Sequence, residues 1–352
     1  MRMNTAIRNL RTTLLLSYLL CLFVIAPFAA QAQDEVPESE VEEYIAEVRP
    51  GPQDELVPIK IGIVVIDVDK IDGADQLFIA NFAVRAEWND SRLAEDVDYV
   101  RVINMDKVWT PNLQVLNQQK LFGTFPDQVQ VLPDGTVIYN QRYWGTLSYP
   151  MNLQNFPLDS HLLEIKLIAV GKDSRNIDLI VSEKYTGMSN VLTVTDFEVV
   201  SWEALAQVEE ITSSLPELPG VVFKFEAKRL VGFYIIKVIT PLILIVFMSL
   251  VVLFIDPSQV GPKFSIAITA ILTLIAYRFL LGNLLPKISY LTHMDYFLFG
   301  SMFLVFAVLV ETLIVARLTN MEKVDKAKTL DYWARYAFVV LFIIIMVGSF
   351  TV

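Results

Sequence analysis

Hydrophobic and polar positions alternate in short runs through the first part of the chain. The alternation has a period of two and is interrupted by turn signals, a pattern typical of β-strands with one buried face. Many such runs, with no long helical pattern between them, predict an immunoglobulin-like β-sandwich over residues 58–230. The clearest runs are residues 59–68, 77–87, 129–139 and 162–170.

A turn signal lies inside one of these runs. Pro133 and Asp134 favour a turn, and Gly135 can adopt the positive φ that a tight turn requires. The sequence therefore predicts a β-hairpin that joins residues 129–132 to residues 136–139.

Four long apolar segments follow the alternating part. At about 1.5 Å of rise per helical residue, each can cross a hydrocarbon core of about 30 Å. The sequence thus predicts an all-α four-helix transmembrane domain over residues 231–352, and four crossings return the chain to the side from which it entered. The segments are residues 231–254, 264–281, 296–318 and 332–352.

The first 32 residues are predicted to be a secretory signal peptide. Three arginines precede the apolar run 14–29, and a small-x-small cleavage pattern follows it at residues 30–32. A fifth transmembrane helix is the alternative, but Ser17 and Pro27 interrupt the apolar run. Residues 33–57 are predicted to be an acidic lead-in to an exported β-sandwich.

Charge divides the chain in the same way. Residues 34–229 contain 33 acidic and 16 basic side chains, a net charge of −17. Nucleic acid is not expected as a partner of so acidic a domain. Residues 237–352 contain 9 basic and 6 acidic side chains, and four of the basic ones lie in the connector 317–328. This connector is therefore expected to face the inside of the cell.

Few residues of the chain are suited to catalysis. The only cysteine, Cys21, lies in the predicted signal peptide, and the only histidines are His161 and His293. No zinc-protease helix, glycine-rich phosphate loop or nucleophile elbow is present in the sequence. Because an enzyme needs an acid, base or nucleophile set in one place, we expect no enzymatic activity, no disulfide, no metal and no cofactor.

The second apolar segment carries a stripe of six residues on one helical face. Their spacing alternates between four and three residues, and the stripe is polar at both ends and apolar in the middle. It is either a packing face or, in a ring of identical helices, a pore lining in which Leu272 and Phe279 form the gate by expelling water. The stripe consists of Ser265, Thr269, Leu272, Ala276, Phe279 and Asn283.

Several motifs resemble those of the pentameric ligand-gated ion channels. The segment YPMNLQNFPLD at residues 149–159 is similar to the signature loop of that family, and Tyr149 and Leu163 stand where animal receptors have bridged cysteines. The missing bridge and the short connector before the last membrane segment resemble the bacterial branch. Further matches are W-x-D at 88–90, W-x-P at 109–111, Arg229, Pro241 and Leu-Pro-Lys at 285–287.

The resemblance implies a homopentamer around a central pore. It also implies a bacterial inner-membrane protein with a periplasmic β-sandwich, a periplasmic C-terminus and contacts with membrane lipid.

Two other classes of protein remain possible: a non-conducting membrane-anchored periplasmic sensor or binding protein, and an anchored enzyme. A sensor is expected to carry a cytoplasmic output domain, whereas the inner connectors 255–263 and 319–330 are too short for one.

The resemblance also implies a coupling site where the sandwich meets the helices. An ion pair between Asp159 and Arg229, shared with Asp72, would transmit movement together with Pro286 and Lys287. The alternative is that these residues are solvated surface charges. The motif aromatics Trp88, Trp109 and Phe156 are predicted to belong to the sandwich core rather than to a ligand site.

The sequence leaves the agonist open between protons and a small molecule. Amine-responsive family members use an aromatic cage, but Ala83 and the segments 110–120, 167–175 and 208–222 supply no aromatic residue. The histidines are candidates for pH sensing or are satisfied structural residues. The candidate ligand-binding residues are Arg85, Glu209, Glu210 and Glu217, and the candidate pH sensors are His161 and His293.

Charged residues of the membrane segments bear on ion selectivity. Glu311 is predicted to be paired within the protein, and Arg278 is predicted to pair with Asp295. The inner segment 259–263 lacks the acidic ring of cation-selective members and ends in a lysine. The acidic outer domain concentrates cations, and we therefore predict permeation of monovalent cations.

Overall fold

The computed structural model describes residues 48–52, 54–171, 173–211, 213, 216–282 and 285–351. The predicted signal peptide and residues 33–47 of the predicted lead-in lie outside these residues.

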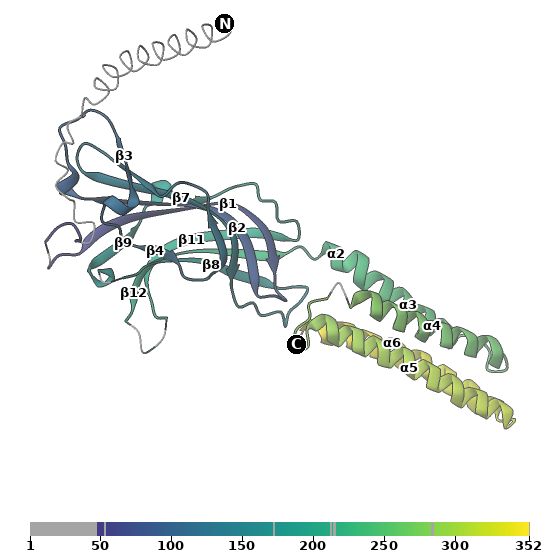
Figure 1. The fold of residues 1–352 in the computed structure, drawn as a ribbon. Coiled ribbons are helices and arrows are strands. Elements are labelled where there is room, and N and C mark those ends of the chain that lie inside the picture. The colour runs from purple at the N-terminus through teal and green to yellow at the C-terminus, as the bar shows by residue number, and fades with distance from the viewer. Residues whose placement is uncertain are drawn as a thin grey trace, which may run out of the picture. The chain divides into compact units, whose positions relative to one another are not determined.

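The strands of the first part form two sheets (Figure 1). One sheet has the order β10-β1-β2-β7-β6-β3, with β5 also paired to β7 and β9 to β1, and the other has the order β11-β12-β8-β4. The strands are β1 (Val57–Asp72), β2 (Leu77–Asn89), β3 (Arg101–Asn104), β4 (Leu113–Val115), β5 (Gln118–Gly123), β6 (Gln128–Val131), β7 (Thr136–Ser148), β8 (Ser160–Ala169), β9 (Ile177–Val181), β10 (Gly187–Met188), β11 (Phe197–Glu209) and β12 (Leu218–Arg229).

Side chains that alternate along the strands build the core between the sheets. In β2, every second residue is buried, as its alternating sequence predicts. Phe78 of β2 meets Phe225 of β12 edge to face, with 5.7 Å between ring centroids, so the two sheets share one core. Trp88 and Trp109 are each only 3% exposed and pack edge to face at 6.2 Å. Their predicted place in the core is confirmed, and the predicted sandwich is present.

The hairpin between β6 and β7 forms at the predicted turn. Gly135 has a φ of 82°, and its N–H donates to the carbonyl of Leu132 at 3.0 Å. A Cβ atom at this position would lie 2.5 Å from the carbonyl oxygen of Asp90. Both the backbone angle and the close approach therefore require glycine here.

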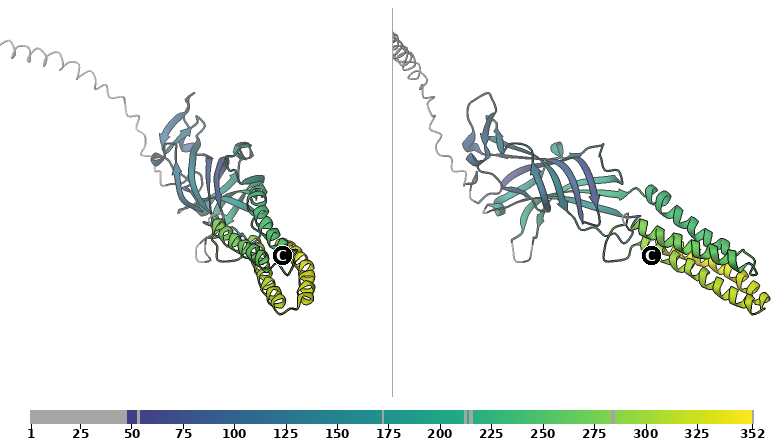
Figure 2. Two further views of the ribbon diagram at one scale, coloured as in Figure 1. Left: turned by 90° about the vertical axis from the view of Figure 1, so that its right-hand side faces the viewer. Right: turned by 45° about the vertical axis from the view of Figure 1, so that its right-hand side comes forward.

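Among the described residues, four helices that are long and apolar enough to cross a membrane follow the strands, and they lie side by side as a bundle (Figures 1 and 2). The first combines α2 (Gly232–Tyr234), the π-helical turn η5 (Ile235–Ile239) and α3 (Thr240–Val252). The others are α4 (Val260–Leu281), α5 (His293–Asn320) and α6 (Val324–Thr351). The chain is a multi-pass membrane protein in architecture, and the predicted β-sandwich followed by four membrane-length helices is confirmed.

Helix boundaries differ from the hydropathy pattern at the polar ends. α4 begins four residues before the predicted segment, and α6 begins eight residues before it. The predicted connector 319–330 shrinks to residues 321–323. Hydropathy marks the part of a helix that lipid can cover, whereas the lysines and alanine of residues 324–331 continue α6 beyond that part at little cost.

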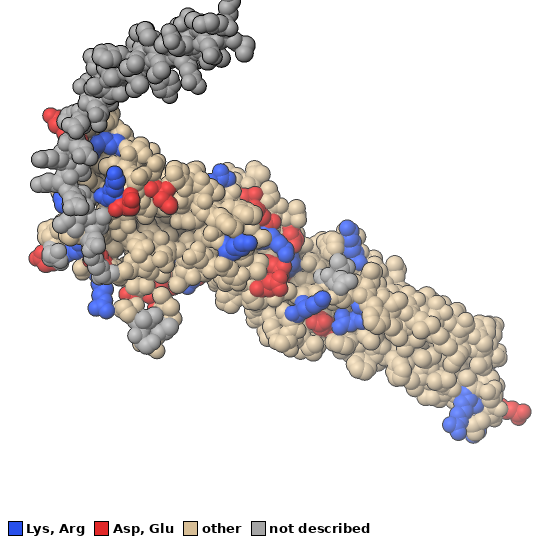
Figure 3. Space-filling view, viewed as in Figure 1, with Lys and Arg blue, Asp and Glu red and all other residues tan. Residues whose placement is uncertain are grey.

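Charge is distributed as the sequence indicates. On the face in Figure 3, charged side chains gather over the strands and near the start of the helices. Most of the helical surface on that face is uncharged, and lysine, arginine and acidic side chains reappear at the far end of the bundle.

We expect Gly135→Ala to destabilise the sandwich by about 1–3 kcal/mol, because alanine strains a backbone with positive φ. Thermal unfolding of the detergent-purified protein, followed by circular dichroism, should show a lower midpoint. Gly187→Ala is the matched control, because a Cβ atom there would meet no described atom within 4 Å. Equal midpoints for the two variants would contradict the requirement for glycine at position 135.

Candidate functional site

The α4 stripe is uncovered in the single chain. Leu272 is 59% exposed and Phe279 is 79% exposed, and Ser265, Thr269 and Ala276 are exposed as well. Asn283 lies outside the described residues. The opposite face of the helix is buried through Lys263, Ala267, Ala270, Leu274 and Leu281.

The hydroxyl at the inner part of the stripe is bonded within its own helix. The Thr269 hydroxyl donates to the Ser265 carbonyl at 2.8 Å, so the helix does not depend on a partner for this group. The stripe therefore has hydroxyl side chains toward the start of the helix and uncovered apolar side chains after them. Such a face can contact either lipid, another helix or a water-filled path.

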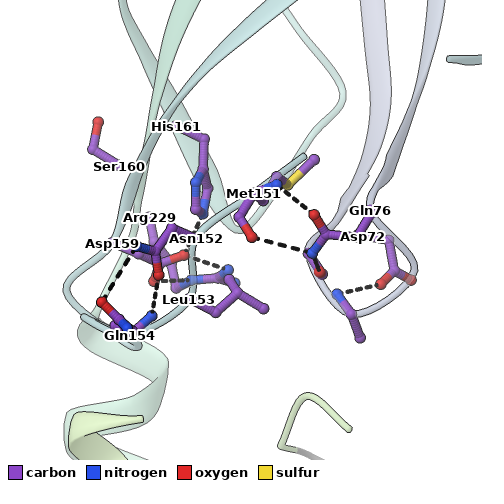
Figure 4. A network of polar contacts seen from close by, with 12 residues as sticks. Asp72, Gln76, Met151, Asn152, Leu153, Gln154, Asp159, Ser160, His161 and Arg229 are labelled. Carbon is purple, nitrogen blue, oxygen red and sulfur yellow. Dashed lines mark hydrogen bonds and ion pairs between the residues drawn. The ribbon is translucent and has the colours of Figure 1, made fainter. Parts of the chain in front are cut away.

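Asp159 and Arg229 form a buried two-pronged ion pair (Figure 4). Arg229 Nε donates to Asp159 Oδ1 at 2.7 Å, and Nη2 donates to Oδ2 at 2.8 Å. The side chains are 7% and 1% exposed. The predicted pairing is confirmed, and the alternative of solvated surface charges is wrong.

Aromatic rings surround the guanidinium of Arg229. Its central carbon lies 4.4 Å from the ring centroid of Phe197, 5.0 Å from that of Phe156 and 5.8 Å from that of Tyr234. These rings exclude water and attract the cation through their faces. Phe156 is 1% exposed, as its predicted core position requires.

His161 also contacts Asp159, and together His161, Asp159 and Arg229 form one buried polar cluster. Its Nε2 lies 2.6 Å from Asp159 Oδ2, and the residue is 5% exposed. Burial opposes ionisation of the Asp159 carboxyl, but hydrogen bonds from His161 and Arg229 outweigh this cost and lower its pKa to about 2. Because the pKa is lowered, the carboxylate contributes stability above pH ~4 and loses that contribution as pH falls toward 2. Asp159 therefore stays ionised through the physiological range.

Asp72 does not share this ion pair. Its carboxylate lies 2.7 Å from Lys70 Nζ and accepts the N–H groups of Ala74 and Asp75 at 3.1 Å each. The prediction of a shared pair is wrong because the β1–β2 turn satisfies the carboxylate locally. Figure 4 shows Asp72 on a separate loop from Arg229.

The signature loop, residues 149–159, contacts three parts of the chain that lie outside the sequence motifs. Gln76 Nε2 donates to the Met151 carbonyl at 3.1 Å, which ties the β1–β2 turn to the loop. The Leu153 N–H donates to the Tyr290 hydroxyl at 2.9 Å. Phe156 packs edge to face on Tyr234, with 4.9 Å between centroids. No sequence signal distinguishes Gln76, Tyr234 or Tyr290 from other residues.

The start of α5 also rests on this loop. The backbone N–H groups of His293 and Met294 donate to the carbonyls of Gln154 and Phe156 at 2.9 and 3.2 Å. Pro286 is half-buried and Lys287 is exposed in the connector between α4 and α5. The structure thus places Pro286 and Lys287 in the segment that contains Tyr290, but it does not place them on the Asp159–Arg229 pair.

The candidate pH sensors differ in their surroundings. His161 is bonded to Asp159, whereas His293 lies in the first turn of α5. The Nδ1 atom of His293 is buried and has no hydrogen-bond partner among the described residues.

The candidate ligand-binding residues do not come together within one chain. Arg85 lies in the larger sheet and lines a cavity of about 510 Å³ with Phe125, Asn140 and Tyr185. Its guanidinium lies 4.3 Å from the Tyr185 ring centroid and 3.4 Å from Glu87 Oε2. Arg85 Nε is buried and has no hydrogen-bond partner among the described residues.

The acidic candidates lie at the β11–β12 end of the other sheet. Glu209 is 6% exposed and its Oε2 accepts from Lys166 Nζ at 3.0 Å, so its charge is already compensated. Glu210 and Glu217 are exposed. Of the candidate ligand-binding residues, Arg85 is thus the one that lines this cavity in the described part of the chain.

The predicted charge pairs of the helices have mixed outcomes. Glu311 Oε1 lies 3.7 Å from Lys263 Nζ, which confirms that Glu311 is paired within the protein. The predicted Arg278–Asp295 pair is wrong. Asp295 caps α5 through a reciprocal pair of bonds with Thr292, and the Arg278 guanidinium lies 5.4 Å from the Phe299 ring centroid. Local capping competes successfully for the carboxylate.

Two family models together match most of the chain. One, described as the neurotransmitter-gated ion-channel ligand binding domain, matches residues 33–231. The other, described as the neurotransmitter-gated ion-channel transmembrane region, matches residues 238–342.

The chain is also similar to known channel and receptor proteins. It is 24% identical over 295 residues to a proton-gated ion channel of Gloeobacter violaceus, covering 83% of this chain and 82% of that channel. It is 26% identical over 280 residues to the human gamma-aminobutyric acid receptor subunit alpha-2, covering 76% of this chain and 62% of that subunit. For the chicken subunit alpha-6, the identity is 26% over 291 residues, covering 79% and 62%. The chain thus spans less than two thirds of these receptor subunits.

We expect the Asp159–Arg229 pair to be strongly coupled in a double-mutant cycle with Asp159→Asn and Arg229→Gln. Loss of Arg229 alone should cost about 3–5 kcal/mol of unfolding free energy, because it leaves a buried carboxylate with less compensation. The double variant should lose less than the sum of the single variants, by about 1–3 kcal/mol. Urea unfolding in detergent, followed by tryptophan fluorescence, measures both quantities.

The exposed Lys70–Asp72 pair is the control for this cycle, since Lys70 is 58% exposed. Its interaction energy should stay below about 1 kcal/mol. Strict additivity of Asp159→Asn and Arg229→Gln would contradict a direct pair.

Proposed function

Since the chain belongs to the neurotransmitter-gated ion-channel family, we propose that five identical copies form a ligand-gated ion channel around a pore lined by α4. The uncovered stripe on α4 is the observation that carries the proposal. Its opposite face is already buried by the chain's own helices, so the stripe is free to face a central axis. The proposed lining residues are Ser265, Thr269, Leu272, Ala276, Phe279 and Asn283.

Leu272 and Phe279 form the proposed gate. Both are large, apolar and more than half exposed in the single chain. Five copies of either side chain around a narrow axis would create an apolar ring that water leaves, and ions do not cross a dewetted ring. The hydroxyls of Ser265 and Thr269 at the inner end would line the hydrated part of the path.

The signature loop is the proposed coupling element. Arg229 ends β12, which leads directly into the first membrane helix, and the Asp159 pair ties it to the end of the loop. The loop also holds Tyr290, in the segment with Pro286 and Lys287 that leads from α4 to α5. A shift of the sandwich would therefore act on the first helix and on the end of α4 together.

Protons or a small molecule are the proposed agonists. The similarity to a proton-gated ion channel supports the first, and His161 contacts Asp159 at the proposed coupling site. The cavity beside Arg85 and the similarity to gamma-aminobutyric acid receptor subunits support the second. In a pentamer, Glu210 and Glu217 of one subunit could border the Arg85 cavity of the next.

Cations are the proposed permeating ions. The outer part carries a net charge of −17 in residues 34–229 of each subunit, which raises the cation concentration over about 8 Å of solution. The proposed setting is a bacterial inner membrane, with the sandwich and the C-terminal end of α6 on the outer side. Helix α6 supports this arrangement, because Phe350 at its end packs on Phe297 near the start of α5.

Recording from bilayers that contain the purified protein tests the proposal. Mass measurement in detergent should give five copies. Currents should appear when outer pH or a panel of small amines and carboxylates is changed, and they should reverse near the sodium equilibrium potential. A monomeric or dimeric particle, or bilayers that stay silent under every condition, would reject the channel. Reversal at the chloride potential would reject cation selectivity alone.

We expect Leu272→Thr to favour the open state, because a hydroxyl in the apolar ring stabilises water there. The half-activating stimulus should fall about tenfold, which corresponds to about 1.4 kcal/mol. Leu244→Thr on α3 is the matched control, since Leu244 has a similar exposure of 64% outside the stripe. An unchanged activation curve and leak for Leu272→Thr would remove Leu272 from the gate.

We expect His161→Gln to flatten the dependence of open probability on pH between 5 and 8. Asp159 remains ionised in this range because its pKa is about 2, and His161 is the candidate sensor that contacts it, at 2.6 Å. His293→Gln provides the comparison at the other candidate histidine. A wild-type pH response in His161→Gln would exclude this cluster as the proton sensor.

A further inference from the structure

The lysine at the inner end of α4 is buried. Lys263 is 1% exposed, and its Nζ donates to Asp331 Oδ1 of α6 while Glu311 Oε1 of α5 lies 3.7 Å away. Asp331 is also 1% exposed, and the Glu311 side chain is 11% exposed. One ammonium therefore stands against two carboxylates at the meeting point of three helices.

The position of Lys263 on α4 matters for the pore. Lys263 precedes Ser265 by two residues, so at about 100° per residue its side chain leaves the helix on the far side from the stripe. The sequence pattern predicts this lysine as a charge of the inner mouth. The structure instead turns it into the bundle.

A second contact fixes α6 beside this cluster. Arg335 lies one helical turn after Asp331, and its Nε donates to the Leu253 carbonyl at 2.8 Å. Its guanidinium also lies 4.7 Å from the ring centroid of Phe254. Consecutive turns of α6 thus contact the end of α3 and the start of α4, and α6 is held where Asp331 can reach Lys263.

Without the hydrogen bond to Asp331, Lys263 has a short route to water, because neither carboxylate oxygen of Glu311 has a hydrogen-bond partner among the described residues. Residues 256, 258, 259, 261 and 262 around the α3–α4 turn are exposed or half-exposed, so the inner solution lies close to the start of α4. A lysine stem can lie along apolar surface while its ammonium extends to water, and a buried ammonium without a partner is costly. A released Lys263 would therefore move its charge to the inner mouth.

We infer that Asp331, assisted by Glu311, is a positioning residue that holds the Lys263 ammonium out of the ion path and so sets ion selectivity at the inner mouth. The inference rests on the proposed function, because it requires α4 to line a pore. In a pentamer, five positive charges are withheld from the path by five acidic residues on α6, the helix that follows α4 and α5 in the chain.

The test is Asp331→Asn in the full chain, which removes the charge and keeps the size of the side chain. In a sodium chloride gradient, the chloride-to-sodium permeability ratio should rise about twofold or more, since five added cations raise the local anion concentration. If wild-type currents already follow chloride, the single-channel chloride conductance should rise instead. Asp325→Asn is the matched control, because Asp325 is an exposed acid on the same helix.

A second variant separates selectivity from packing. Lys263→Gln together with Asp331→Asn replaces the ion pair by two amides, and it should conduct with the wild-type permeability ratio because no charge is released. A changed ratio in the double variant would overturn the inference, even if Asp331→Asn alone does not assemble. An unchanged ratio and conductance in assembled Asp331→Asn would overturn it as well.

The wild-type recording distinguishes the two levels of failure. Silent wild-type bilayers reject the proposed channel, and the inference with it. Conducting wild-type pentamers in which Asp331→Asn changes nothing leave the channel standing and reject only the role of Asp331.

Discussion

The buried pair of Asp159 and Arg229 is the interaction on which the junction depends. A buried ion pair often stabilises a fold no more than well-packed apolar residues of the same size would, but loss of one partner is expensive. Such a pair therefore fixes geometry more than it adds stability. Here it fixes the last residue of β12, and so the point at which the chain enters the helical bundle, against the end of the signature loop.

The contacts around this pair spread from one loop to several helices. Phe156 reaches Tyr234 of the first helix, while the backbone of the same loop accepts bonds from the first turn of α5. Tyr290 bonds the loop from the segment between α4 and α5. Because these contacts originate within a few consecutive residues, one loop joins the sandwich to the first helix, to the start of α5 and to the segment before it.

Periodic burial made much of this architecture predictable from sequence. Alternation located the strands, long apolar runs located the helices, and Pro133, Asp134 and Gly135 located the hairpin. The hydrogen-bond partners of charged residues were not predictable, because several polar groups compete for each charge. Asp72 and Asp295 bind groups within a few residues of themselves, whereas the partner of Lys263 lies 68 residues away on another helix. Sequence spacing does not show which of several available partners is nearest in the folded chain.

The π-helical turn η5 has a consequence for the first membrane helix. Proline at position 241 cannot donate a backbone hydrogen bond, and the wider turn before it is closed partly by the Thr240 hydroxyl, which donates to the Ile235 carbonyl at 2.9 Å. In a regular helix, the direction of Tyr234 would dictate the direction of every later residue. The wider turn rotates the residues after it about the helix axis. Tyr234 can therefore point toward Phe156 while Leu242 and Val246 point into the bundle. One continuous helix thereby packs on both the signature loop and the other membrane helices, although these lie in different directions from its axis.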